Sequence, residues 1–498
     1  MGIIKRQGIK SSIVNYLGAM IGAVSVLFIY PLDDEIYGYA QWLYNTAFLL
    51  IPMASFGFLS IMLKYFPSFN TSDSKNYNGF LSLILLLLSG AFLLFLGFWY
   101  FFKSAFLRLL ELLNMKAELV ENNEIYILLL LAFLILGHFL TYQSANRLRI
   151  VVPNMIQVFG FKLFLPLLVL AYVYLGMTQT QFAYGMVAFF GVATLLIFIY
   201  LNFIKGIAFG RIKKPSVDFS YKEMGTYSIF GSLNQLSSGF AMRIDSIMIP
   251  FFLEMVNNGF YNKTLFITNI IEIPTRSINQ IAGPIIAKAW KENDLQEINT
   301  VYKKASTNLF VVGSFVFLAV WYALDDLISI SADPNSFPDA RMIFLLLGCG
   351  KLVDMITSVN TQIIIYSKKY KYNLIFLVLL AISNVILNLK LIPEYGIVGA
   401  AIATTISLVA YNLIKIAFIY LNYGFHPFTK STFKTLVLLL ILALIFYAFP
   451  TGMHPLISIV VKLTFISILF LPIAYFWRIS DDINDSILSL WNKYLSKS

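Results

Sequence analysis

Nine charged residues lie within long apolar stretches of this sequence, where a charge requires a specific reason. They are Lys162, Arg243, Arg276, Lys351, Lys415 and Lys462, together with Asp245, Glu272 and Asp354. A charge at the centre of a bilayer costs about 2.5–3.5 kcal/mol on insertion scales, so such residues face a protein interior or a wet cavity. Basic residues outnumber acidic ones six to three. This excess favours an anionic ligand such as a diphosphate, because Arg and Lys are the usual partners of phosphate groups.

Polar residues accompany these charges at helical spacing. Asn269, Glu272, Arg276 and Asn279 step by three and four residues along one stretch, and Pro274 is expected to kink that helix. Comparable stripes occur in three other stretches, and a shared water-filled cavity would explain them all. The predicted cavity-lining residues are His138, Tyr142, Asn146, Asn269, Asn279, Ser358, Asn384 and Asn388.

Two interpretations of the charges remain open. Glu272 with Arg276, and Lys351 with Asp354, could neutralise each other as local pairs three or four residues apart. Such pairs do not account for Lys162, which has no acidic residue in its own stretch.

Arg243 is also unexplained by local pairing, because Asp245 lies two positions away and points to another face of the helix. We therefore predict that four basic residues hold a diphosphate: Lys162, Arg243, Arg276 and Lys351. Asp245, Glu272 and Asp354 are candidates for modulating that charge or for proton or sodium coupling. Lys415 and Lys462 lie nearer the ends of their stretches and are expected to extend toward the membrane surface.

The composition identifies the elements that must position these residues. The chain has 498 residues, of which 59% are hydrophobic and 12% charged, and its mean hydropathy is +0.78. A soluble domain carries about 25% charged residues, so this is an integral membrane protein. Fourteen apolar stretches are long enough to span a bilayer. They are 11–30, 38–64, 79–102, 124–146, 151–175, 180–204, 223–252, 258–287, 303–323, 339–366, 372–392, 396–421, 431–449 and 456–477.

Charge between the stretches predicts the orientation. With both termini in the cytoplasm, most of the 36 Lys and Arg residues fall on the cytoplasmic side, as the positive-inside rule requires. The basic clusters follow membrane topology, and nucleic acid is not an expected partner. The external connections are short and carry acidic residues, among them Asp33, Asp34 and Glu35.

The order of the stretches predicts two lobes of six helices around a central cavity. We expect an N-terminal lobe over 1–207, a cytoplasmic linker at 208–222, a second lobe over 223–424, and two further helices with a cytoplasmic tail over 425–498. Six helices per lobe make any repeat parallel, with its axis along the membrane normal. In the stretch 396–421, Gly396 with Ala400, and Gly399 with Ala403 and Ser407, form a face of small residues expected to serve close helix packing.

Motifs for soluble chemistry are missing. The sequence has no G-x-x-x-x-G-K-[ST], no H-E-x-x-H and no nucleophile elbow, and its three histidines are widely dispersed. We therefore predict a protein that is not an enzyme and has no metal or cofactor, driven by an ion gradient or the membrane potential. A membrane glycosyltransferase or polymerase remains the alternative of another class, with the acids at 33–35 as its natural site, although such enzymes usually need larger external loops.

Three blocks of sequence resemble the polysaccharide and O-antigen flippases of the multidrug/oligosaccharidyl-lipid/polysaccharide exporter superfamily. They are "LNLKLIPEYGIVGAAIATTIS", "RIDSIMIPFFLEMVNNGFYNKT" and "YPLDDEIYGYAQWLYNTAF". The resemblance implies alternating access and a flippase that turns undecaprenyl-diphosphate-linked oligosaccharide to the outer leaflet of a bacterial inner membrane. Other polysaccharide-assembly membrane proteins are candidate partners.

Two relatives within that superfamily remain alternatives: a lipid II flippase and a cation-coupled multidrug exporter. The multidrug branch typically carries an acidic ion-binding residue in its first helix, whereas 11–30 contains none. This departure counts against drug export.

Overall fold

The chain is all helical in a computed structural model that describes residues 2–69, 79–212, 220–445, 452–480, 482 and 484. The first part contains α1 (Gly2–Phe28), η1 (Tyr30–Leu32), α2 (Asp34–Ala54), α3 (Phe58–Phe69), α4 (Phe80–Leu112), α5 (Glu118–Asn146), α6 (Val151–Asn154), the π-helical turn η3 (Met155–Phe159), α7 (Gly160–Leu175) and α8 (Gln179–Phe203). The remainder contains α9 (Tyr221–Phe252), α10 (Met255–Thr268), η4 (Asn269–Glu272), α11 (Ile273–Glu292), α12 (Leu295–Ser329), η5 (Pro334–Ser336), α13 (Ala340–Thr357), α14 (Asn360–Tyr366), α15 (Lys371–Tyr423), α16 (Lys430–Ile445) and α17 (Pro455–Phe476).

Many of these helices are long and apolar enough to cross a membrane. Eight helices among the described residues meet that criterion, or up to ten if each of two bent pairs counts as one span. The pair α2 and α3 is bent by 54°, and the α13 region and α14 are bent by 48°. The prediction of an all-α integral membrane protein is confirmed, and each of the fourteen predicted stretches is helical over most of its described length.

The long helix α15 holds two of those stretches, because the chain reverses inside it. Gly396 has φ 59° and ψ −140°, a left-handed backbone conformation that favours glycine. The side-chain amide of Asn384 donates to the Thr404 hydroxyl at 3.0 Å. Residues twenty apart on a straight helix would be about 30 Å apart, so this bond requires the two arms of α15 to fold back on each other.

The small residues beyond the reversal allow the two arms to pack closely. A Cβ atom at Gly399 would collide with the backbone carbonyl oxygen of Leu391. Ala400 and Ala403 are fully buried, and Ser407 is nearly so. The predicted packing role is therefore confirmed within α15 for Gly399, Ala400, Ala403 and Ser407, whereas Gly396 has open space around its Cβ position and serves the reversal.

Side-chain caps begin several of the helices. Asp33 accepts a hydrogen bond from the backbone N–H of Ile36 at 2.9 Å and so caps α2. Thr178 and Gln181 form a capping box at the start of α8. Asp33 therefore has a structural role, and the acidic turn at 33–35 serves in part to start a helix.

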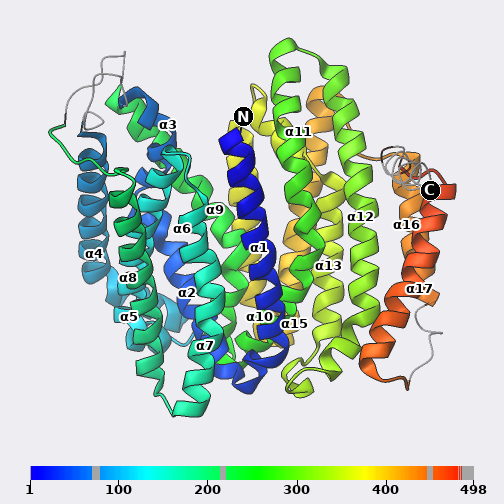
Figure 1. The fold of residues 1–498 in the computed structure, drawn as a ribbon, viewed down its shortest axis with the longest axis horizontal. Coiled ribbons are helices and arrows are strands. Elements are labelled where there is room, and N and C mark those ends of the chain that lie inside the picture. Colours follow the sequence, from blue (N-terminus) through cyan, green and yellow to red (C-terminus); the bar gives the residue numbers. More distant parts are fainter. Residues whose placement is uncertain are drawn as a thin grey trace. The chain divides into compact units, whose positions relative to one another are not determined.

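The described chain forms two compact units, Met1–Gly259 and Phe260–Ser498. In the first unit, α2 packs against α5 and α9, and α5 packs against α8. In the second unit, α12 contacts α11, α13, α16 and α17, and α13 packs on α15 (Figure 1).

The boundary between the units differs from the predicted one. It falls within α10, whereas the sequence placed it at the linker 208–222 and assigned α9 to the second lobe. The extensive packing of α9 on α2 and α3 explains the difference, since it holds α9 in the first unit. Residues 213–219 of the predicted linker lie outside the described residues, and the parallel repeat and central cavity stay predictions.

Candidate substrate-binding sites

In the first unit, Arg243 of α9 is held against α2. Its guanidinium donates a hydrogen bond to the Oδ1 atom of Asn45, which is 4% exposed. The guanidinium carbon lies 4.0 Å from the ring centroid of Phe48 and 5.5 Å from that of Tyr44. Both rings provide cation–π stabilisation and leave the charge of Arg243 intact. We call Arg243, Asn45, Tyr44 and Phe48 the Arg243 cluster.

Two predicted cavity residues of α5 extend this cluster. The His138 ring meets Phe48 edge to face at a centroid distance of 5.8 Å, and its centroid lies 6.1 Å from that of Tyr142. Both side chains are partly exposed. Asn146 instead donates to the backbone carbonyl of Met62 at 3.1 Å, so it ties α5 to α3.

Lys162 and Asp245 also lie in the first unit. A Cβ atom at Gly18 would lie 3.1 Å from the Cδ atom of Lys162, so the missing side chain on α1 leaves room for the lysine to pass. Asp245, two residues from Arg243, is buried at 8% exposure.

In the second unit, Lys351 and Glu272 form an ion pair between helices. The Lys351 Nζ atom lies 2.6 Å from Glu272 Oε1, joining α13 to η4. The alternative interpretation paired Lys351 with Asp354 and Glu272 with Arg276. It is wrong for Lys351 and Glu272, because these two residues pair with each other. The Glu272 carboxylate compensates the charge of Lys351, so Lys351 is a weaker candidate for binding phosphate.

Asp354 belongs to a buried network centred on Asn412. Its Oδ1 accepts from the Asn412 amide at 3.1 Å. The Oδ1 atom of Asn412 in turn accepts from Thr357 at 2.9 Å and from Asn360 at 3.2 Å. The carboxylate is therefore oriented by α15 at the junction between α13 and α14.

Two lysines contradict the sequence analysis. Lys415 was expected to reach the membrane surface, but it is fully buried and donates to Thr361 and, at 3.0 Å, to the Tyr411 hydroxyl. Lys462 is 8% exposed and lies 2.6 Å from Asp326 of α12. Both expectations were wrong, because side chains within the protein satisfy the two ammonium groups: Thr361 of α14 and Tyr411 of α15 for Lys415, and Asp326 of α12 for Lys462.

The other predicted residues of η4 and α11 are less enclosed. Asn269 and Arg276 are exposed, whereas Asn279 is partly buried. Pro274 follows η4, so the predicted kink is present as a break between α10 and α11. The Oδ1 atom of Asn279 has no hydrogen-bond partner among the described residues.

Three further predicted cavity residues are buried within the second unit. Ser358 ends α13 with φ 49° at the bend toward α14. Asn388 donates to Asn384 at 2.7 Å, and Asn384 bonds Thr404 across the α15 reversal. Asn384 therefore joins the arms of α15, and Asn388 holds the Asn384 amide from within the same arm. Among the residues that the structure describes, no group of three or more His, Cys, Asp or Glu could hold a metal ion.

Sequence reasoning missed the neutral partners in both units. Asn45 and Asn412 contact the charged residues but were not singled out. Asn45 and Asn412 do interrupt apolar stretches, which is a signal that could have drawn attention to them. Their partners lie on other helices, however, and spacing within one helix does not identify such pairs.

Comparisons with known proteins support a transporter fold. No protein-family model matches the chain. It is 20% identical to the probable low-salt glycan biosynthesis flippase Agl15 of Haloferax volcanii over 273 residues, which are 54% of this chain and 57% of that protein. The chain thus spans little more than half the length of this relative, and about half of a second flippase-named relative, AglR.

Solved structures cover far more of the chain. The lipid II flippase MurJ in an inward closed conformation aligns with a TM-score of 0.67 and 15% identity, covering 94% of this chain and 99% of its own. An inward-facing multidrug resistance MATE transporter of the MOP superfamily aligns with a TM-score of 0.59 and 15% identity, covering 82% and 94% of the two chains. The resemblance to the multidrug/oligosaccharidyl-lipid/polysaccharide exporter superfamily is confirmed at the level of the fold.

Proposed function

We propose that this chain is a flippase that moves undecaprenyl-diphosphate-linked oligosaccharide from the cytoplasmic to the outer leaflet of a bacterial inner membrane. The transport is by alternating access, and the polyprenyl tail stays in lipid during passage. The relatives named as flippases and the fold shared with MurJ support this proposal.

The Arg243 cluster is the observation that carries the proposal. A cation within the helices is energetically costly, and the side chains that contact Arg243 in the cluster are the neutral Asn45, Tyr44 and Phe48. A guanidinium has five N–H donors, more than Asn45 can accept, and its geometry matches phosphate oxygens. Phe48 and Tyr44 hold the group in place without neutralising it. Arg243 is therefore the first candidate for the diphosphate contact.

The remaining predicted basic residues contribute unequally in this proposal. Arg276 is exposed and suits a second phosphate contact, and Lys162 is a further candidate on α7. Lys351 is the weakest of the four because Glu272 already compensates its charge. Asp354 and Asp245 remain candidates for proton or sodium coupling, whereas Glu272 is engaged by Lys351.

The test is the identity of the lipid that accumulates when the protein is depleted, measured by mass spectrometry of extracted polyprenyl diphosphates. We expect a repeat-unit oligosaccharide on the lipid, cleared by wild-type protein but not by Arg243→Ala. Arg243→Lys should clear part of it, because it keeps the charge without the forked geometry.

Arg341→Ala is the matched control. Like Arg243, Arg341 lies over an aromatic ring: its guanidinium carbon is 4.5 Å from the ring centroid of Trp321. It also has a side-chain partner, the carboxylate of Asp325. This variant should clear the lipid normally. Full clearance by Arg243→Ala would overturn the role of Arg243.

The accumulated lipid also separates the alternatives. Accumulation of lipid II would assign the chain to peptidoglycan synthesis. If no polyprenyl-linked sugar accumulates and sensitivity to cationic drugs rises, the chain is a drug exporter. Release of free polyprenyl diphosphate by the purified protein would instead identify an enzyme.

A further inference from the structure

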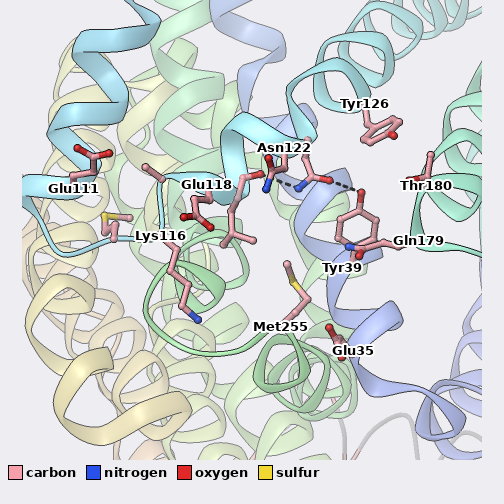
Figure 2. Close-up of a pocket in the computed structure, with 14 residues that line it drawn as sticks. Glu35, Tyr39, Glu111, Lys116, Glu118, Asn122, Tyr126, Gln179, Thr180 and Met255 are labelled. Carbon is pink, nitrogen blue, oxygen red and sulfur yellow. Dashed lines mark hydrogen bonds between the residues drawn. The ribbon is translucent and has the colours of Figure 1, made fainter.

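The first unit contains a pocket that the proposed translocation site does not use. It lies among the starts of α2, α5, α8 and α10 and the end of α4, and its volume is about 760 Å³. This volume is within the range of small-molecule sites. In Figure 2, Glu111, Lys116 and Glu118 lie on one side of it, and Tyr39, Tyr126, Gln179 and Thr180 lie on the other.

The lining offers mixed hydrogen-bonding groups beside aromatic rings. Asn122 and Gln179 have amides that both donate and accept, Thr180 has a hydroxyl, and Tyr39 and Tyr126 contribute rings with a polar edge. Sugars need this combination, because each hydroxyl donates and accepts while the C–H face of the ring is apolar.

Contacts that do not depend on a ligand hold the walls in place. Tyr39 donates to Asn123 at 2.6 Å, and Asn123 donates to the Leu119 carbonyl at 2.9 Å. Lys116 donates through Nζ to the Leu253 carbonyl at 2.7 Å, and its backbone N–H donates to the Phe251 carbonyl at 3.0 Å. The pocket is thus preformed, and Lys116 fastens its wall to the end of α9, the helix that carries Arg243.

The charge of the pocket excludes a phosphate ligand. Glu35, Glu111 and Glu118 line it against a single basic residue, Lys116, whose ammonium is engaged by Leu253. A diphosphate would be repelled by three carboxylates. Neutral sugars and amino sugars would not be, because carboxylates accept hydrogen bonds from hydroxyl and ammonium groups.

We propose that this pocket binds neutral or amino-sugar units of the translocated oligosaccharide at the outer side of the membrane. The connections that form it, near residues 33, 115, 178 and 254, all belong to the side that the distribution of Lys and Arg assigns to the exterior. The inference rests on the proposed flippase function. It separates two tasks within the first unit: Arg243 holds the diphosphate, and this pocket receives the glycan.

The experiment measures binding of sugar without lipid. The probe is the oligosaccharide released by mild acid from polyprenyl-linked glycans of the host, added to the full-length protein in detergent and followed by saturation-transfer NMR. We expect saturable binding that inorganic diphosphate does not displace. Asn122→Leu should weaken it about tenfold, since it replaces an amide that donates and accepts hydrogen bonds by an apolar group of similar size.

Two glutamates on the first turns of α5 provide a matched pair. Glu118 lines the pocket, whereas Glu121 is exposed and lies outside it. Glu118→Gln should weaken binding, and Glu121→Gln should leave it unchanged.

The outcomes distinguish this inference from the proposed function. If lipid-linked glycan accumulates on depletion but the free oligosaccharide does not bind, or Asn122→Leu binds it as wild type does, the pocket assignment is overturned and the flippase stands. If inorganic diphosphate displaced the bound oligosaccharide, the pocket assignment would also be overturned, because the oligosaccharide would then bind at a cationic site. If no lipid accumulates although sugar binds in the pocket, the flippase proposal fails instead.

Discussion

The Lys351 ammonium and the Glu272 carboxylate lie 2.6 Å apart although 79 positions separate them in the chain. The lysine side chain is 11% exposed and the glutamate side chain 34% exposed, so the pair is only partly screened by its surroundings. It connects the 3-10 turn between α10 and α11 to α13. The pair thus stabilises the second unit at the point where Pro274 interrupts the helical hydrogen bonds.

This pair should behave as a coupled unit in unfolding experiments. Lys351→Met should lower the free energy of unfolding by about 2 kcal/mol, between the values typical of exposed and buried pairs, because it leaves Glu272 uncompensated. Adding Glu272→Gln should recover about 1 kcal/mol. Thermal unfolding in detergent of both single variants and the double variant measures the coupling.

The pair of Lys288 and Glu292 is the control. These residues are 3.8 Å apart with both side chains largely exposed, so Lys288→Met should leave thermal unfolding unchanged. Additive effects of Lys351→Met and Glu272→Gln would show that the ion pair contributes nothing to stability.

Lys415 should contribute as much to the stability of the protein as Lys351 does, although it lies near the end of α15. Lys415 interacts electrostatically with Asp354, which also interacts with Glu272 and Lys351. Lys415→Met removes the hydrogen bonds to Thr361 and Tyr411 and the electrostatic attraction to Asp354. We expect a loss of about 2 kcal/mol, measured by thermal unfolding.

A second substitution tests the charge balance directly. Asp354→Asn should restore part of the stability of Lys415→Met, since it replaces a carboxylate that has lost its attraction to Lys415. Lys371→Met, at the exposed beginning of the same helix, should have no effect. A Lys415→Met protein as stable as wild type would mean that its burial is incidental.

Much of the fold could be predicted from hydropathy, because an apolar stretch that crosses a bilayer must satisfy its backbone internally and so forms a helix. The break at Pro274 and the close packing at Gly399 were predicted for similarly local reasons. The partners of the charged residues could not be predicted in this way. Spacing reveals neighbours on one helix, such as Tyr411 four residues before Lys415. Glu272, Thr361 and Asp326, in contrast, lie on other helices than the lysines that they contact.

The position of Lys415 near the end of its helix led to the wrong prediction that its ammonium reaches the membrane surface, again because a partner lies on another helix. Lys415 lies eight residues from the end of α15, within reach of the surface for a long side chain. The structure buries it because α14 presents Thr361 to its ammonium. A tertiary hydrogen bond replaced water, and no local pattern in the sequence indicates where such a bond will form.

The reversal within α15 depends on two glycines for different reasons. At Gly396 a Cβ atom would meet nothing within 4 Å, so Gly396→Ala should cost only backbone strain. Its φ of 59° with ψ −140° lies near a region restricted essentially to glycine, which costs other residues about 1–3 kcal/mol. At Gly399 a Cβ atom would collide with the Leu391 carbonyl, so Gly399→Ala must separate the arms of α15.

We therefore expect Gly399→Ala to lower the thermal unfolding midpoint more than Gly396→Ala does. Gly90→Ala is the control, since it lies in α4 with open space around it and should be neutral or slightly stabilising. The reverse order, with Gly396→Ala the more damaging, would show that backbone conformation outweighs the close approach of the arms.

Asn45 offers a way to test whether the charge of Arg243 is what the transporter needs. Asn45→Asp would keep a side chain of the same shape beside the guanidinium but would neutralise it, so the attraction for a diphosphate should fall. Asn45→Ala would remove the hydrogen bond and leave the charge. If Arg243 binds the diphosphate, Asn45→Asp should therefore impair clearance of the accumulated lipid-linked glycan more than Asn45→Ala does. Equal amounts of each variant in the membrane establish that folding is not the cause, and better clearance by Asn45→Asp than by Asn45→Ala would show that Asn45 acts by positioning Arg243 and that the uncompensated charge is dispensable.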